Sequence, residues 1–169
     1  MRRLRSAALA VPLALGVATS AGAASPTPAA PGFRVPVLDS GRVIDSRELT
    51  GTVMVLRFQA SYCRPCAREA AAFGRVVDRY RERGVVFLAL HVQDARGDTR
   101  RFIRTHHVDY PVALDPRLAI GNQFGFKGTP YTVVVDRRGR MVARLRGEGA
   151  VARLPRILDN ALLEGSRPR

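Results

Sequence analysis

Hydrophobic residues in this chain follow two patterns, which together predict alternating strands and helices. Short apolar runs are typical of buried strands, and they cover residues 53–58, 85–90 and 131–135. Apolar residues at three- and four-residue spacing are typical of helices with one buried face; they extend from residue 66 to Gly84 and cover residues 98–107, 115–124 and 151–163. Strands that alternate with helices indicate an α/β fold, in which helices flank a central mixed β-sheet on both faces.

Turn and cap residues refine this outline. The sequence Asp39-Ser40-Gly41 separates residues 33–38 from 42–44, which predicts an N-terminal β-hairpin extension, and one helical turn is expected over residues 46–49. Asp98 is expected to cap one helix, and Asp115 followed by Pro116 marks the start of another. The turn at residues 136–139 leads into a further strand over residues 141–145, which closes the sheet before the last helix.

The N-terminus has the pattern of an export signal. Arg2, Arg3 and Arg5 precede an apolar stretch over residues 7–18, and Ala21-Gly22-Ala23 forms a small-residue cleavage site. We therefore expect a signal peptide over residues 1–23 and a periplasmic or otherwise extracytoplasmic location. The alternative is an uncleaved segment that tethers the protein to the membrane, although the apolar stretch is short for a bilayer span.

The rest of the chain divides into three parts. Residues 24–32 are rich in Pro, Ala, Ser and Thr, and predict a flexible leader. A single folded domain is expected over 33–165, because 169 residues suit one domain and 46% of them are hydrophobic. Residues 166–169 are expected to be a disordered tail.

The formal net charge of +14 would suit a nucleic-acid or membrane-binding protein. Lys127 is the only lysine, however, and the arginines are scattered over every segment rather than gathered in one run. This distribution does not predict a nucleic-acid partner.

The two cysteines of the chain, Cys63 and Cys66, lie where the first apolar strand gives way to a helix. A thiol at a helix start lies near free backbone N–H groups and the positive end of the helix dipole, and both stabilise the reactive thiolate. Two cysteines at this spacing are also close enough to form a short disulfide. The pair is therefore predicted to be a redox couple.

Other uses of the cysteine pair fit less well. A structural zinc site takes four ligands, and neither a second pair nor suitably spaced histidines accompany Cys63 and Cys66. Covalent haem attachment requires histidine directly after the second cysteine, where Ala67 stands. A structural disulfide that closes so short a loop removes little chain entropy. We therefore expect a redox-active disulfide with no metal and no cofactor.

Taken in order, these features resemble the TlpA/ResA-like group of exported thioredoxin-fold oxidoreductases. The resemblance covers residues 33–163 and depends on the strand-CxxC-helix, the second apolar strand, the segment Tyr110-Pro111-Val112, and the run from Gly128 to Asp136 with Gly139. It implies a thioredoxin-like fold for the domain and thiol-disulfide oxidoreductase activity.

The resemblance also implies a set of site residues. Cys63 would attack a substrate disulfide and Cys66 would resolve the mixed disulfide. Pro130 would follow a cis bond that places Thr129 beside Cys63, where a substrate strand could pair. Tyr62, Arg64 and Pro65 complete the residues expected to face substrate.

A carboxylate after the second core strand often accepts the proton in this family, and Asp94 matches that position. His91 is a second candidate base, because an imidazole titrates in the required range. Two departures from the family alter this site: Gln59 replaces an aromatic residue, which makes the substrate-facing platform more polar, and Arg57 stands where Asn or Asp is usual. Arg57 either lies beneath the cysteines and favours thiolates, or extends its stem to the sheet edge.

The direction of electron flow stays open at this point. The first hypothesis is a reductant of disulfides in exported proteins such as apocytochrome c, itself reduced by a membrane electron-transfer partner. The alternative within the same fold is an oxidant that forms disulfides, which Arg57 and Arg64 favour. A copper-binding chaperone is the alternative from another class, and a peroxidase lacks the expected threonine-rich cysteine context. We expect that the partners are protein thiols and disulfides. We also expect the protein to be a monomer.

Overall fold

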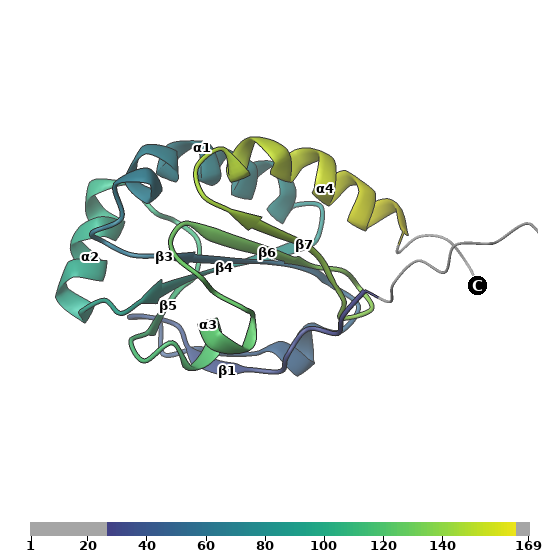
Figure 1. The fold of residues 1–169 in the computed structure, drawn as a ribbon, viewed down its shortest axis with the longest axis horizontal. Helices are drawn as coiled ribbons and strands as arrows, with labels where there is room; N and C mark the ends of the chain where they lie inside the picture. The colour runs from purple at the N-terminus through teal and green to yellow at the C-terminus, as the bar shows by residue number, and fades with distance from the viewer. Residues whose placement is uncertain (1–26, 165–169) are drawn as a thin grey trace, which may run out of the picture.

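The computed structural model describes residues 27–164 as a mixed β-sheet with helices on its faces (Figure 1). The strands are β1 (Arg34–Pro36), β2 (Val43–Asp45), β3 (Val53–Gln59), β4 (Val85–Val92), β5 (Val112–Asp115), β6 (Tyr131–Val135) and β7 (Met141–Arg146). The helices are η1 (Ser46–Leu49), a 3-10 turn, and α1 (Arg64–Arg81), α2 (Arg96–Thr105), α3 (Ala119–Gln123) and α4 (Ala150–Glu164). The predicted signal peptide and tail lie outside the described residues.

The main sheet has the strand order β5-β4-β3-β6-β7, which places β3 at its centre. Strands β3, β4 and β5 are parallel to one another, whereas β6 runs antiparallel to β3 and β7 antiparallel to β6. The sheet is therefore mixed, as the sequence predicts. Because β3 pairs on both sides, its C-terminal end is held firmly at the point where the cysteines follow.

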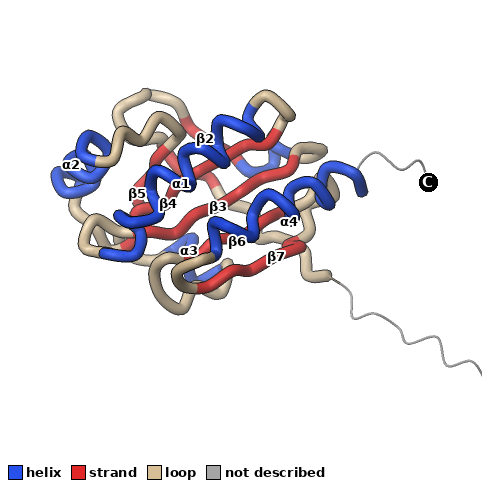
Figure 2. Tube along the Cα trace, turned by 90° about the horizontal axis from the view of Figure 1, so that it is seen from above, coloured by secondary structure: helices blue, strands red, loops and turns tan. Residues whose placement is uncertain are grey.

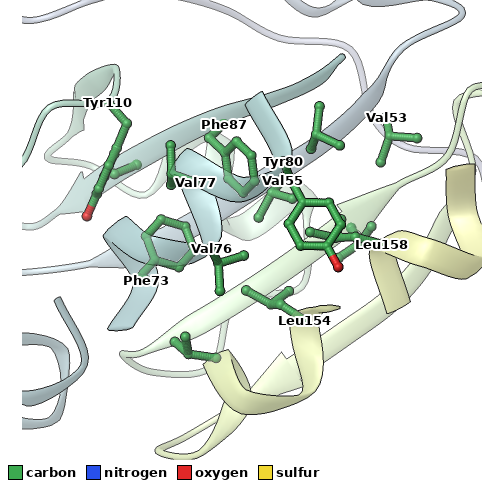
Figure 3. Packing of buried hydrophobic residues seen from close by; sticks show 14 of the residues in the cluster. Val53, Val55, Phe73, Val76, Val77, Tyr80, Phe87, Tyr110, Leu154 and Leu158 are labelled. Atoms are coloured by element: carbon green, nitrogen blue, oxygen red, sulfur yellow. The ribbon is translucent and has the colours of Figure 1, made fainter. Parts of the chain in front are cut away.

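Helices α1 and α4 cover one face of the sheet, with α1 over β3 and β4 and α4 over β6 and β7 (Figure 2). The core on this face joins alternate residues of β3 and β4 to the apolar stripe of each helix, with Phe73, Tyr80, Leu154 and Leu158 among its largest members (Figure 3). The aromatic rings of Phe73 and Phe87 meet edge to face with centroids 6.0 Å apart. This packing fixes α1, and with it the redox motif, against the sheet.

The opposite face is covered by the N-terminal β1-β2 hairpin, η1 and α3 (Figure 1). Phe33, Phe58 and Phe124 lie together in this second core. Helix α2 lies at the end of the sheet near the cysteines, where Phe102 belongs to the same buried cluster as Cys63 and Cys66. The predicted α/β fold, its N-terminal hairpin and the turn at residues 46–49 are thereby confirmed.

The structure corrects three predicted boundaries. Asp98 does not cap α2, because the helix begins at Arg96 and Asp98 lies in its first turn. Asp115 ends strand β5 instead of starting a helix, and its carboxylate accepts hydrogen bonds from the N–H groups of Ile120 and Gly121 in α3. The ordered chain also begins before residue 33: Ala29 forms a β-bridge with Arg140 at the start of β7.

No helix within residues 27–164 is long and apolar enough to span a bilayer.

The apolar face of α4 should supply much of the stability of the α1 side. Leu158 is fully buried, whereas Leu163 on the same helix is 66% exposed. We expect Leu158→Ala to lower the free energy of unfolding by about 2–5 kcal/mol, since it removes transfer energy and leaves a cavity. Leu163→Ala is the matched control and should change it by less than about 0.5 kcal/mol. Urea unfolding followed by circular dichroism measures both, and equal losses would contradict this packing.

Candidate active site

Cys63 and Cys66 form a disulfide at the N-terminus of α1. The two Sγ atoms are 2.04 Å apart and the Cα atoms 5.2 Å apart. Cys63 occupies the N-cap position, and its sulfur accepts a hydrogen bond of 3.2 Å from the backbone N–H of Cys66. Cys63 is 5% exposed and Cys66 fully buried, so that Cys63 is the more accessible residue of the pair.

The turn between β3 and α1 is held by Asp94. Its carboxylate accepts hydrogen bonds from the backbone N–H of Ser61 at 2.8 Å and from the Ser61 hydroxyl at 2.6 Å. A further bond of 3.3 Å comes from the Thr99 hydroxyl in α2. Asp94 therefore ties the residues just before Cys63 to the end of β4 and to α2.

A hollow of about 660 Å³ opens beside this turn. It is lined by Tyr62 and by residues of α2 and its C-terminal cap, including Asp98, Arg101, Phe102 and His106. Tyr62 directly precedes Cys63 and is 61% exposed. The hollow combines aromatic rings with charged and hydrogen-bonding groups, which suits a polypeptide segment better than a purely apolar ligand.

Thr129 and Pro130 precede β6, and the bond between them is cis, as expected. In the antiparallel pairing of β6 with β3, Tyr131 lies opposite Phe58. The same register brings Pro130 level with the end of β3, where the active-site turn begins. Thr129 is partly exposed and Pro130 buried, whereas Arg64 is exposed and Pro65 partly exposed at the start of α1.

Behind the disulfide, the face of β3 that points toward α1 changes from apolar to polar. Val53 and Val55 belong to the core, but Arg57 and Gln59, two and four residues further on, are fully buried polar side chains. Arg57 donates to Glu69 Oε2 at 2.9 Å and stacks over the ring of Phe73, 4.9 Å from its centroid. The alternative in which the Arg57 stem reaches the sheet edge is therefore wrong, and so is a substrate-facing Gln59.

His91, on β4, is buried opposite Gln59. Its Nδ1 lies 2.8 Å from Asp94 Oδ2, and its Nε2 lies 2.9 Å from the side-chain nitrogen of Gln59. Burial lowers the pKa of His91, although the Asp94 carboxylate opposes this shift. Burial alone would raise the pKa of Asp94, but hydrogen bonds from His91 and Ser61 outweigh it and leave that pKa below its usual value.

Tyr110, which begins the Tyr-Pro-Val segment, lies in the same part of the core. Burial raises its pKa to about 12, against the opposing effect of the nearby Arg57 and Gln59 side chains. The phenol therefore stays neutral across the physiological range.

Glu69 is a site residue that was not predicted from the sequence. Glu69 follows Cys66 by three positions, is 8% exposed, and accepts hydrogen bonds from Arg57 and from the backbone N–H of Gly149. Helical spacing could have found it, because Cys66, Glu69, Ala70 and Phe73 lie on one buried face of α1. A carboxylate at such a position requires a buried partner, and Arg57 is that partner.

Within residues 27–164, no three His, Cys, Asp or Glu side chains are grouped so that they could hold a metal ion.

Relatives and solved structures resemble the chain over most of its length. The thiol-disulfide oxidoreductase ResA of Bacillus cereus is 28% identical over 119 residues, which cover 70% of this chain and 68% of the relative. The ResA protein of Bacillus anthracis is 29% identical over the same shares. A crystal structure of a putative thiol:disulfide interchange protein DsbE from Chlorobium tepidum matches with a TM-score of 0.74 at 27% identity, covering 80% of this chain and 96% of the other.

These similarities agree with the thioredoxin-like architecture, in which a disulfide begins the helix that follows the central strand. The sequence model of one family, described as the AhpC/TSA family, matches residues 26–144. That match spans more than half of the sequence, and the chain therefore belongs to the AhpC/TSA family.

Proposed function

We propose that this protein is an exported thiol-disulfide oxidoreductase that reduces disulfides in exported client proteins, apocytochrome c being one candidate client. The observation that carries the proposal is the Cys63–Cys66 disulfide at the N-terminus of α1. The names of the ResA and DsbE relatives support the same class of activity. An oxidising compartment supplies such an enzyme with client disulfides.

The reaction proceeds in two exchange steps. In the reduced protein, the Cys63 thiolate attacks one sulfur of a client disulfide; the client S–S bond breaks, a mixed disulfide forms, and one client thiolate leaves. The Cys66 thiolate then attacks Cys63, which re-forms the Cys63–Cys66 disulfide and releases the second client thiolate. Two electrons pass from the protein to the client, and a dithiol donor, proposed to be a membrane protein, must return them.

The surface around Cys63 supports binding of an extended client segment. Tyr62 and the hollow lined by α2 lie on one side of the disulfide, and we assign Thr129 and Pro130, at the start of β6, to the other side. Arg64 and Pro65 separate the two cysteines and complete the predicted contact surface. Residues 33–165 act as one catalytic domain in this proposal, and the signal over residues 1–23 directs export.

Asp94 was predicted to accept a proton, and we now propose a different role for it. A carboxylate that accepts several hydrogen bonds and has a lowered pKa stays ionised, which makes it a weak proton acceptor. Holding the Ser61 turn in place fits these contacts better. His91, the second candidate base, is buried with both ring nitrogens occupied.

The reductant is favoured over the oxidant because one argument for the oxidant is weakened. Arg57 was expected to stabilise thiolates, but its charge is matched by Glu69 at 2.9 Å. Of the two arginines that favoured the oxidant, Arg64 remains, and it is exposed, where water screens its charge.

We expect Cys63→Ser to abolish insulin reduction, with a loss of at least about 100-fold, because no thiolate remains to attack the client. Cys66→Ser should also lose turnover but should accumulate a mixed disulfide with the client, visible on a non-reducing gel. Leu163→Ala is a suitable surface control. Unchanged turnover of Cys63→Ser would show that the dithiol mechanism is wrong.

Tyr62→Ala should raise KM for a protein client while kcat changes little, because Tyr62 contacts the client away from the reacting sulfurs. We expect about a fivefold increase, the effect of removing roughly 1 kcal/mol of contact energy. Val43→Ala, which removes another exposed apolar side chain on the hairpin, serves as the control. An equal effect of both variants would argue against a client site at Tyr62.

The reduction potential of the Cys63–Cys66 pair tests the direction of electron flow. A value near about −270 mV supports the reductant, whereas a value near about −120 mV supports the oxidant. Equilibration with glutathione or dithiothreitol buffers, followed by mass spectrometry of alkylated thiols, measures it.

A further inference from the structure

A continuous chain of buried side chains connects the helix after Cys66 with the turn before Cys63. From one end to the other it runs through Glu69, Arg57, Gln59, His91 and Asp94 to Ser61. It crosses α1, β3 and β4, and side chains of both α2 and β6 also bond to it. The redox chemistry proposed above does not by itself require such a chain.

We propose that Gln59 and His91 are positioning residues, which hold the two halves of the redox motif in register only while His91 is a neutral imidazole with its proton on Nδ1. This inference rests on the proposed function, since it concerns how the same pair of cysteines is held for disulfide exchange.

The proton on His91 follows from the atoms on either side of it. Arg57 has only donors, and its Nε lies 3.3 Å from Gln59 Oε1, so that the Gln59 carbonyl must face Arg57. The Gln59 NH₂ group then faces His91 Nε2 at 2.9 Å and donates to it. An Nε2 that accepts carries no proton, which places the single proton of the neutral ring on Nδ1, where it is donated to Asp94.

The pairing of the strands makes these contacts a direct result of the fold. Gln59 and His91 are register partners in the parallel β3-β4 ladder, and Arg57 is the register partner of Thr132 in β6. Arg57 Nη1 lies 3.4 Å from the Thr132 hydroxyl. The Gln59–His91 and Arg57–Thr132 contacts thus join side chains that the sheet already places side by side.

Charged and titratable groups surround His91 on several elements. Asp94 bonds to it directly from the β4-α2 loop, and Arg57 and Glu69 reach it through Gln59 from β3 and α1. From α2, Phe102 stacks edge-on against the imidazole with ring centroids 5.2 Å apart, and the Phe102 ring also contacts that of His106, with centroids 4.4 Å apart. Burial, as noted above, keeps the pKa of His91 below its usual value.

Protonation of His91 would break the chain. An imidazolium has a proton on Nε2 as well, which would point at the Gln59 NH₂ group, donor against donor. Rotating the Gln59 amide would relieve this conflict but would turn the NH₂ group toward the Arg57 donors. One buried hydrogen bond is therefore lost in either case, and the connection between Glu69 and Ser61 is interrupted.

Gln59→Glu should reverse this dependence on protonation. A carboxylate at position 59 can accept from Arg57 and from an imidazolium Nε2–H, so that the chain is complete when His91 is charged. When the ring is neutral, its single proton cannot satisfy both the introduced carboxylate and Asp94. We therefore expect the ratio of mutant to wild-type insulin-reduction rate to rise by about tenfold as the pH falls from about 8 to about 5.5.

Gln59→Leu is the matched control, because it removes both contacts at similar volume. It should be slower than wild type, and its rate relative to wild type should change much less with pH than that of Gln59→Glu. Imidazole ¹⁵N shifts of wild-type protein provide a second measurement that does not depend on any variant folding. They should show an unprotonated Nε2 and a protonated Nδ1 for His91 at pH 7.

A rate ratio for Gln59→Glu that does not change with pH, or a wild-type His91 with its proton on Nε2, would overturn the inference. Failure of the proposed function would give a different result. In that case the wild-type protein itself would not reduce insulin, while the ¹⁵N shifts would still place the proton on Nδ1.

Discussion

The pairing of Arg57 with Glu69 is the interaction on which the active-site end of the molecule depends. A guanidinium at the centre of a sheet, fully buried, must be neutralised by a carboxylate, and breaking such a pair by removing one partner commonly costs about 3–5 kcal/mol. Glu69 also accepts from the Gly149 backbone, so the pair joins β3, α1 and the loop that leads into α4. One buried ion pair therefore holds together the three elements that surround the disulfide.

The Arg57–Glu69 ion pair changes how the positive charge near the cysteines should be understood. From the sequence, Arg57 and Arg64 look like two cations beside a thiol pair. In the structure they differ: Arg57 is buried and matched, and Arg64 is exposed without an ion pair in residues 27–164. The excess of arginine over acidic residues is also partly compensated on the surface, where Asp39 pairs with Arg96 and Arg100 and so links the N-terminal hairpin to α2. Net charge alone therefore gives little information about the field at the disulfide.

Much of the fold could be predicted from hydrophobic spacing, because every strand of the main sheet except β5 corresponds to an apolar or β-branched run. The helix starts were predicted less well, since α2 begins without a side-chain cap and Asp115 caps α3 from the preceding strand. In the site, the cysteine pair followed from its local motif, whereas the cis bond before Pro130 followed from the family resemblance. The contacts of Arg57, Gln59 and Glu69 did not, because they depend on which residues three elements bring together, and a single sequence does not state that register.

Short backbone pairings cover part of each outer strand of the main sheet, and they affect how readily the sheet can pair with another protein molecule. Strands β5 and β7 are its outer strands, and open outer strands offer unpaired N–H and C=O groups to other chains. Val37 and Leu38 bond to β5, while Pro28, Ala29 and Ala30 pair with the start of β7 (Figure 1). The segment before the hairpin and the turn that follows β1 thus each cover part of one outer strand, which leaves fewer free backbone groups for pairing with strands of other molecules.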